Sequence, residues 1–184
     1  MNETDLPLTI DSGHGEIIIF TEVKDEPEGA KVILEGHVQP NCGPALHVHH
    51  KQDEYFHVVQ GTMAYEVPGK ETAYLYPGDS TTFSRDTPHK FWNSGEVELI
   101  LHCWAQPANN LVFYLTTLYA ATNGQKTPKP DAFDLAYLDV KYKSEYSILE
   151  LPWFVKKIIM PLTYYLGWLL GKYKKFKNAP NPIK

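Results

Sequence analysis

Two histidines separated by one residue, His47 and His49, begin the part of the chain with the clearest metal-binding chemistry. Side chains alternate across a β-strand with a period of two, so both imidazoles are expected on one face of a strand, within reach of one ion. Four residues of turn-like composition follow, and Glu54 then opens an alternating apolar run that stops at Gly61. A hairpin would bring the Glu54 carboxylate back beside the histidines. The segment therefore predicts a metal site built on two strands.

Short strands separated by turn residues must position these side chains. Segments rich in β-branched and aromatic residues, bounded by Gly, Pro and Asp, recur from residue 14 to residue 105 and suggest about nine strands. This spacing is typical of a β-sandwich or barrel. After Pro107 the apolar residues Leu111, Leu115 and Leu118 recur at helical spacing. Further helices are expected at about 131–145 and 151–176, the last with a bend at Pro161. We expect a mainly β fold, with a barrel domain at 1–106 and about three α-helices in an extension at 107–184.

Composition limits the class of protein. The chain has 184 residues, of which 43% are apolar, enough for one sizeable core. Seven lysines and no acidic residue lie in 151–184, so the net charge of −5 divides into +7 for this segment and −12 for residues 1–150. An acidic body argues against nucleic acid as a partner. The acidic N-terminal residues 1–11 fit no secretory signal, which favours a cytoplasmic protein. Cys42 and Cys103 lack a C-x-x-C spacing and are expected to be free thiols.

A family resemblance rests on two motifs. His47-x-His49, four residues, Glu54, six residues and Gly61 match the first motif of the cupin superfamily, and Gly78-Asp79 followed by His89 and Asn93 resembles the second. The resemblance implies a double-stranded β-helix, or jelly-roll, barrel with a metal near its mouth. It also implies that the metal ligands are His47, His49, Glu54 and His89. The region after the barrel resembles that of single-domain bacterial cupins with a helical C-terminal extension.

The chain departs from the usual cupin motifs at turn positions only. Ser84 stands where proline is usual, and Asp86 and Asn41 stand where glycine is usual. All four ligand positions are intact, so these differences bear on loop geometry more than on metal binding.

Three imidazoles and a carboxylate suit a divalent transition metal: iron, manganese, nickel, copper or zinc. Such a ligand set leaves coordination positions open for water, oxygen or substrate. Glu54 is also a candidate catalytic residue, because a carboxylate that leaves the ion can act as a general base. The ligand types alone do not select one metal, since affinity follows the same order of metals at nearly any such site.

Strand parity separates pocket residues from the other histidines. Phe56 and Val58 share the face of Glu54, and Phe91 shares that of His89, which predicts an apolar substrate pocket around the metal. His102 shares a face with Ile100 and Trp104 and is expected to point inward as a further pocket residue. His50 and His57 have the opposite parity to the ligands and are expected to point away.

The C-terminal segment is amphipathic. Its apolar stripe consists of Ile158, Leu162, Leu166, Leu169 and Tyr173. The uncharged stretch 158–171 is shorter than the roughly 20 residues that span a bilayer. The stripe is therefore expected to pack on the barrel or on a second subunit of a homodimer, and the flanking lysines also suit an acidic membrane surface.

Three hypotheses follow from the sequence. The first is a metal-dependent enzyme, an oxygenase of the cupin type, acting on a small, partly apolar organic molecule. The second is a non-catalytic cupin that binds a small ligand or uses the metal as a structural clip. The third is a membrane-surface or oligomerising module that acts through the basic C-terminal helix.

Overall fold

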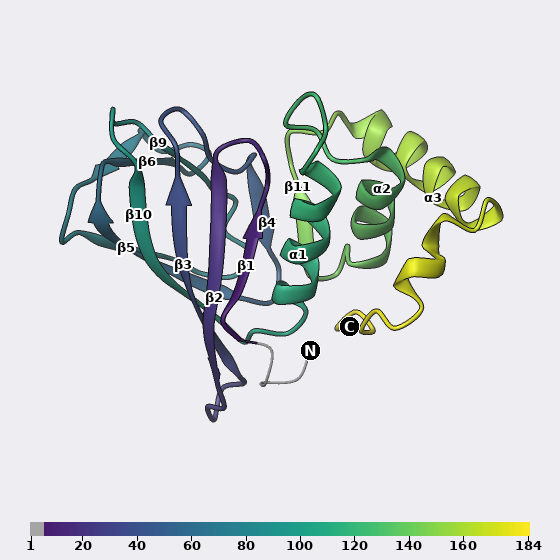
Figure 1. Cartoon of the computed structure of the whole chain (residues 1–184), viewed down its shortest axis with the longest axis horizontal. Helices are drawn as coiled ribbons and strands as arrows, with labels where there is room; N and C mark the ends of the chain where they lie inside the picture. The colour runs from purple at the N-terminus through teal and green to yellow at the C-terminus, as the bar shows by residue number, and fades with distance from the viewer. Residues whose placement is uncertain (1–5) are drawn as a thin grey trace.

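The computed structural model describes residues 6–184; residues 1–5, part of the N-terminal segment on which the cytoplasmic expectation rests, lie outside the described residues. Strands occupy the first part of the described chain and helices the last, so the predicted mainly β fold followed by three helices is confirmed (Figure 1). No helix in the described range is long and apolar enough to cross a membrane.

The strands form three sheets. The largest has six strands in the order β1 (Leu8–Asp11), β2 (Glu16–Lys24), β3 (Lys31–Val38), β10 (Leu99–Gln106), β5 (Asp53–Gln60) and β8 (Ser80–Phe83). The second has β7 (Ala73–Leu75), β6 (Met63–Glu66) and β9 (Lys90–Asn93), and the third pairs β4 (His47–His49) with β11 (Tyr146–Ile148). All the pairings are antiparallel.

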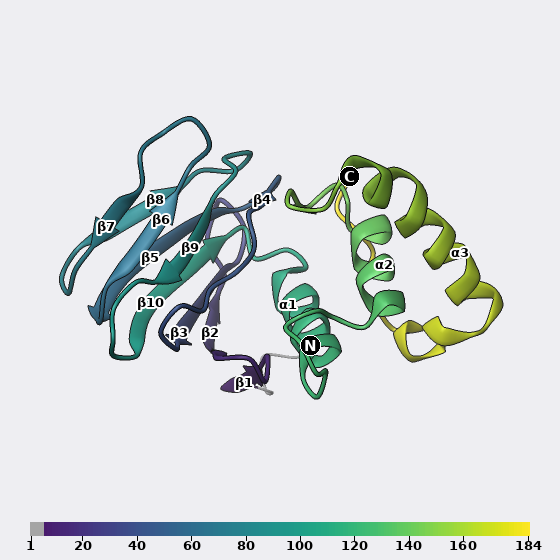
Figure 2. The same cartoon turned by 90° about the horizontal axis from the view of Figure 1, so that it is seen from above.

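The helices lie in successive layers beside the six-stranded sheet. Helix α1 (Leu111–Thr122) lies against β1, α2 (Ala132–Lys141) packs on α1, and α3 (Met160–Leu169) packs on α2 and lies farthest from the sheets (Figure 2). Asp131 caps α2, because its carboxylate accepts hydrogen bonds from the backbone N–H groups of Phe133 and Asp134. Of the three helices, α1 is therefore the one that lies next to the six-stranded sheet.

Two apolar clusters hold these layers together. One joins the two larger sheets and includes Phe56, Val58, Met63 and Leu101. The other runs from the six-stranded sheet through α1 to α2 and is rich in buried tyrosines: Tyr114, Tyr119, Tyr137, Tyr142 and Tyr146. Phenolic side chains bury a large apolar ring and still offer a polar group. The second cluster thus borders the cavity described below.

The structure corrects three local predictions from the sequence. Strands β1 and β11 were not expected, and the predicted helix at 131–145 ends at Lys141 because the chain turns into β11. The predicted hairpin between the histidine strand and the Glu54 strand is wrong: β4 pairs with β11, whereas β5 pairs with β10 and β8. Gln52 lies in the loop between β4 and β5 and is fully buried. It donates a hydrogen bond to the Tyr146 hydroxyl, so this loop is held against β11.

The last predicted helix divides into three helical pieces. Residues Val155–Ile159 form a π-helical turn, α3 follows, and Lys172–Phe176 form a 3₁₀ turn beyond Gly171, which has a φ of +68°. Pro161 lies in the first turn of α3, where a missing backbone donor costs little.

Candidate metal centre

Three of the predicted ligands converge. His47 and His49 lie on β4, Glu54 lies on β5, and their ligand-type atoms are all within 4.8 Å of one another. His89 lies just before β9 and forms an isolated bridge with His47, in which each backbone N–H donates to the other's carbonyl oxygen at 3.0 and 2.9 Å. The His89 Nε2 atom is 3.2 Å from Glu54 Oε2. Thus the structure groups His47, His49 and Glu54 and places His89 directly against the carboxylate.

Backbone carbonyl groups orient two of the imidazoles. The Nδ1 atom of His47 lies 2.8 Å from the carbonyl oxygen of Ala45, and that of His89 lies 2.9 Å from the carbonyl oxygen of Thr87. A carbonyl oxygen can only accept, so each Nδ1 carries a proton, and Nε2 is the nitrogen that holds the lone pair in the neutral ring. Such bonds commonly fix the tautomer of metal-binding histidines. In addition, the ring of His89 stacks on Phe83 with centroids 4.0 Å apart.

The environment favours the neutral form of His47 and His49 and the ionised form of Glu54. Burial lowers the pKa of His47, and the nearby imidazoles of His49 and His89 contribute to a value of about 3. Burial also lowers the pKa of His49. For Glu54 burial acts upward, but the three surrounding imidazoles together lower its pKa to about 2. At neutral pH His47 and His49 therefore present nitrogen lone pairs, and Glu54 presents one negative charge.

The donor set fits a divalent transition metal. Within residues 6–184, the buried atoms Glu54 Oε2 and His89 Nε2, which lie 3.2 Å apart, have no hydrogen-bond partner. Buried polar atoms without a partner are costly, and a cluster of acceptors with no donor is mutually repulsive. A cation bound by nitrogen and carboxylate oxygen would satisfy them. His47, His49 and Glu54, with His89 beside them, are the residues that would hold it.

A cavity of about 500 Å³ adjoins this group, and His47, His49 and Glu54 line it. Its walls are mainly apolar and come from the inner side of the six-stranded sheet, from α1 and from β11. Helix α1 contributes the predicted helical face Leu111, Leu115 and Leu118. The predicted metal ligands thus open onto a space of the size and polarity that small organic ligands occupy.

The predicted pocket residues fall into different environments. Phe56 and Phe91 line the cavity, whereas Val58 is fully buried in the cluster between the sheets. His102 does not line the cavity, which corrects the prediction: its side chain is 60% exposed and lies 3.5 Å from the Glu35 carboxylate. On β10 it is Leu101 and Cys103 that face inward, so the residues that alternate with them point out.

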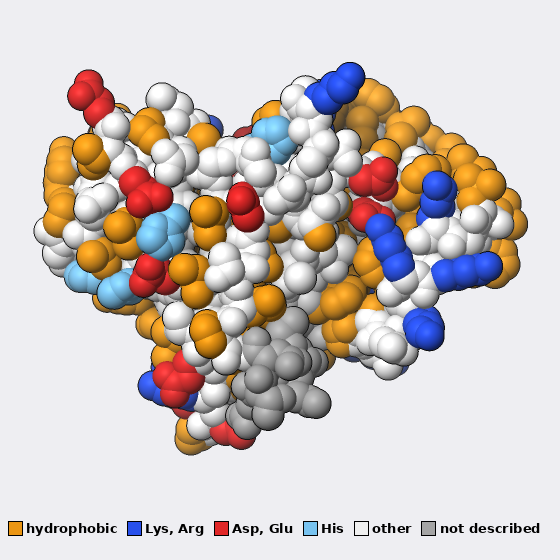
Figure 3. Space-filling model, in the orientation of Figure 1, with side chains coloured by type: hydrophobic (Ala, Val, Ile, Leu, Met, Phe, Trp, Pro, Cys, Tyr) orange, Lys and Arg blue, Asp and Glu red, His pale blue; other side chains and the backbone are white. Residues whose placement is uncertain are grey.

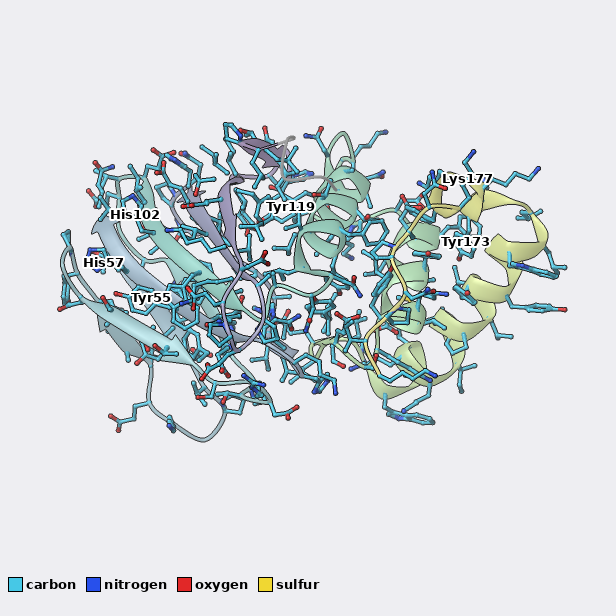
Figure 4. All side chains as sticks on the ribbon, turned by 90° about the horizontal axis from the view of Figure 1, so that it is seen from below. Tyr55, His57, His102, Tyr119, Tyr173 and Lys177 are labelled. Carbon is cyan, nitrogen blue, oxygen red and sulfur yellow. The ribbon has the colours of Figure 1, made fainter. Side chains whose placement is uncertain are left out.

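The histidines excluded by parity lie away from the cavity lining. The Nδ1 of His50 is 2.7 Å from the Asp86 carboxylate, and the Nδ1 of His57 is 2.9 Å from Ser80 Oγ. Figure 4 shows His57 and His102 on the sheets at one end of the molecule, and Tyr119 of α1 nearer its middle.

Several aromatic residues of the cavity were missed in the sequence. Tyr146 of β11 contacts His49 edge-on, with ring centroids 5.2 Å apart, and packs on Tyr114 of α1. Tyr119 donates a hydrogen bond to Glu16, whose pKa burial raises. The only signal for Tyr146 in the sequence was a short Tyr-Ser-Ile run after the second helix, which is too brief to be distinguished from a loop.

Two departures from the motif pattern have a structural explanation. Asn41 and Asp86, which stand where glycine is usual, have φ angles of +62° and +61°. Asn and Asp tolerate this left-handed conformation better than other residues that carry a Cβ. At Gly43 an added Cβ would lie 2.1 Å from the carbonyl oxygen of Phe91, so the loop needs a glycine there.

Comparison with known proteins places part of the chain in a described family. Residues 34–105 match the family model for the Cupin domain. "Oxidoreductase iacF" of Pestalotiopsis fici is 33% identical over 98 residues, which are 48% of this chain and 48% of that protein. "Probable oxidoreductase virH" of Hypocrea virens is 34% identical over 95 residues, 47% of this chain and 43% of that protein. The chain thus spans about half the length of these curated relatives.

A solved structure is also similar. An uncharacterized conserved protein with a double-stranded beta-helix domain from Klebsiella pneumoniae aligns with a TM-score of 0.41 and 25% identity, over 48% of this chain and 76% of that one.

Proposed function

Because residues 34–105 form a cupin domain with a histidine and glutamate group on an apolar cavity, we propose that the chain is a metal-dependent oxidoreductase. More specifically, we propose that it is an oxygenase that acts on a small, partly apolar organic molecule. The observation that carries it is the opening of His47, His49 and Glu54 onto a cavity of about 500 Å³. The names of the two fungal relatives, both oxidoreductases, support the reaction class.

The roles of the residues follow from their placement. His47, His49 and Glu54 would hold the metal, with His89, whose Nε2 is 3.2 Å from Glu54 Oε2, as a fourth ligand. A redox-active metal, when bound, supplies one-electron chemistry with dioxygen that side chains alone do not offer. Glu54 lies at the cavity wall and could accept a proton from a substrate held there.

The cavity wall supports an aromatic or otherwise planar substrate. Tyr114, Tyr146 and Phe56 present ring surfaces to the same space, and aromatic rings stack favourably on one another. The hydrogen-bonded pair of Glu16 and Tyr119 adds a polar part to this wall. We therefore expect a molecule with an apolar ring and at least one polar substituent.

Metal content and oxygen uptake test the proposal. Purified protein is expected to contain close to one equivalent of a transition metal by elemental analysis. His49→Ala should lose most of it, because one of three grouped ligands is removed. His57→Ala, which removes a histidine outside the group, serves as the matched control and should keep wild-type stoichiometry. Unchanged metal content in His49→Ala would end the proposal.

Catalysis is tested separately with the metal-loaded protein. Oxygen consumption across a panel of aromatic compounds and keto acids should show turnover of at least one member, and this turnover should disappear in His49→Ala. Ligand binding without turnover of any panel member, by a protein with full metal content, would instead favour the alternative of a non-catalytic binding cupin.

A further inference from the structure

Helix α3 has two apolar faces, of which only one is used inside the molecule. The inner face packs on α2 through buried Met160 and Gly167 and through Tyr164, whose ring lies 6.2 Å from that of Tyr137. Tyr173, from the following 3₁₀ turn, joins this inner side at 5.2 Å from Tyr164. The sequence placed Tyr173 on one stripe with four other residues that were expected to pack. The structure leaves those four exposed.

The outer face of α3 carries large apolar side chains where a surface helix normally carries polar ones. We call it the outer α3 face and define it by six residues that are between 46% and 63% exposed: Ile158, Leu162, Tyr165, Leu166, Trp168 and Leu169. Contiguous exposed apolar surface of this kind marks an interaction site more often than an accident of packing. In Figure 3 it forms the apolar right-hand edge of the molecule.

Charge indicates what covers this face. The segment 151–184 has seven lysines and no acidic residue, whereas residues 1–150 carry a net charge of −12. Lys157 lies immediately before the outer α3 face, and Lys172, Lys174 and Lys177 follow it, all exposed. Lysines beside an apolar helical face with Trp and Tyr are the pattern of a helix that lies in the interface of an anionic bilayer.

The dimensions agree with a helix that lies flat and does not span. The π-helical turn and α3 together run from Val155 to Leu169, which is about 22 Å at the usual rise per residue. The hydrocarbon core of a bilayer is about 30 Å thick. Apolar side chains on one face of such a helix can enter the upper acyl region while the flanking lysines meet lipid phosphates.

A second copy of the chain fits this face less well. A two-fold symmetric contact through the outer α3 face would bring the lysine-rich segments of two copies together, with like charges facing one another. Outside the C-terminal part of the chain, the exposed large apolar side chains among the described residues are Val59, Tyr74, Tyr76 and Val97, which lie on β5, on and just after β7, and just before β10. They offer no obvious matching apolar surface.

We propose that the outer α3 face and its flanking lysines bind the surface of an anionic membrane. The acidic body then faces away from the lipid, because its charge is repelled by the same surface. No residue of α3 lines the cavity beside the metal centre, so membrane binding and ligand binding use different parts of the chain.

Vesicle co-sedimentation of the full chain tests this proposal. Wild-type protein should bind vesicles of phosphatidylcholine with 30% phosphatidylglycerol, and binding should fall at least tenfold on pure phosphatidylcholine or in 0.5 M salt. Leu162→Ser/Trp168→Ser/Leu169→Ser should weaken binding at least tenfold, and Lys174→Gln/Lys177→Gln should weaken it less and flatten its salt dependence. The control Tyr74→Ser/Tyr76→Ser/Val97→Ser, which removes exposed apolar groups elsewhere, should bind like wild type.

All the substituted residues are exposed, so each variant is expected to fold. Circular dichroism and metal content check that it does. Two results would overturn the proposal. One is the absence of wild-type binding to the anionic vesicles. The other is binding that the triple α3 variant and the control weaken equally. The first of these results can come with a wild-type dimer that the triple α3 variant converts to monomer. In that case the outer α3 face is an interface between copies of the chain.

Discussion

His47 is surrounded by two other imidazoles and a carboxylate, and the folded chain strongly favours its neutral form. This preference suits metal binding, because only a neutral imidazole offers a lone pair. In the metal-free protein, however, the same preference lowers the stability of the folded state at acidic pH. The unfolded chain takes up a proton on this histidine near its ordinary pKa of about 6.5, whereas the folded chain resists protonation until about pH 3. Between these values the unfolded state binds more protons, so stability must fall as the pH falls.

The metal-free protein is therefore expected to lose stability between pH 7 and pH 5. Linkage with the pKa of about 3 gives a contribution from His47 of about 2 kcal/mol over this range. Urea unfolding of chelator-treated protein at the two pH values measures the loss, and His47→Gln should reduce it by about that amount. Glu54 does not enter this window, because its ordinary pKa and its lowered pKa both lie below pH 5. Equal pH dependence in the wild type and in His47→Gln would contradict the prediction.

Spacing in the sequence was enough to select the residues that converge, but it was not enough to orient every side chain. His47, His49 and Glu54 were chosen from their motif, and the structure brings them together. His102 was placed inward from alternation along β10, and it lies outside. Alternation divides a strand into two faces without saying which face is buried, and both faces of β10 carry apolar residues. Only the packing of the sheet decides between them.

At the scale of elements, α1 and β11 supply the part of the cavity wall that the other strands do not. The strands supply the metal-binding side chains and one wall of the cavity, and the other wall depends on elements that follow the barrel in the sequence. The sequence predicted α1 from its leucine spacing. It did not predict that β11 would pair with β4, because a three-residue strand has almost no local signal and its partner lies about 100 residues earlier. The site is therefore shared between the two predicted domains.

Filling the cavity from the α1 side should block the reaction without disturbing the metal. Leu118 lines the cavity, and Leu118→Trp adds an indole to the space that the substrate is proposed to occupy. We expect kcat/KM to fall at least tenfold while the metal content stays at the wild-type level. Ala120→Trp adds the same side chain on the exposed side of α1 and should keep wild-type kinetics. Steady-state oxygen uptake with a substrate from the panel measures both variants.

The outcome of this comparison separates two accounts of the cavity. If Leu118→Trp is as active as the control, the substrate does not enter between α1 and the sheet. If both variants lose metal, the substitution has disturbed the fold, and a smaller change such as Leu118→Phe replaces it.

At the scale of the whole molecule, the C-terminal segment packs against residues from the middle of the sequence. After α3 and the 3₁₀ turn, residues 180–183 run back beside α1 and α2, and in Figure 1 the C-terminus lies near the start of α1. Glu145 is fully buried and accepts hydrogen bonds from Asn110 and from the backbone N–H of Ile183. The side chains of Tyr142 and Ser144 donate to the carbonyl oxygens of Pro180 and Ile183. These contacts connect the end of the chain to the layer of helices that closes the cavity.

Removal of residues 180–184 should therefore destabilise the body as well as free the tail. The deletion removes the N–H that Glu145 uses and leaves a buried carboxylate with one donor fewer. Because loss of a partner at a buried charged group costs more than an exposed hydrogen bond, we expect a loss of about 2–4 kcal/mol in the free energy of unfolding. Deletion of Lys184 alone, which spares the hydrogen bonds named above, is the matched control and should change little. A truncated chain as stable as this control in urea would show that these contacts are peripheral, and that α1 and α2 hold the cavity wall without the C-terminal segment.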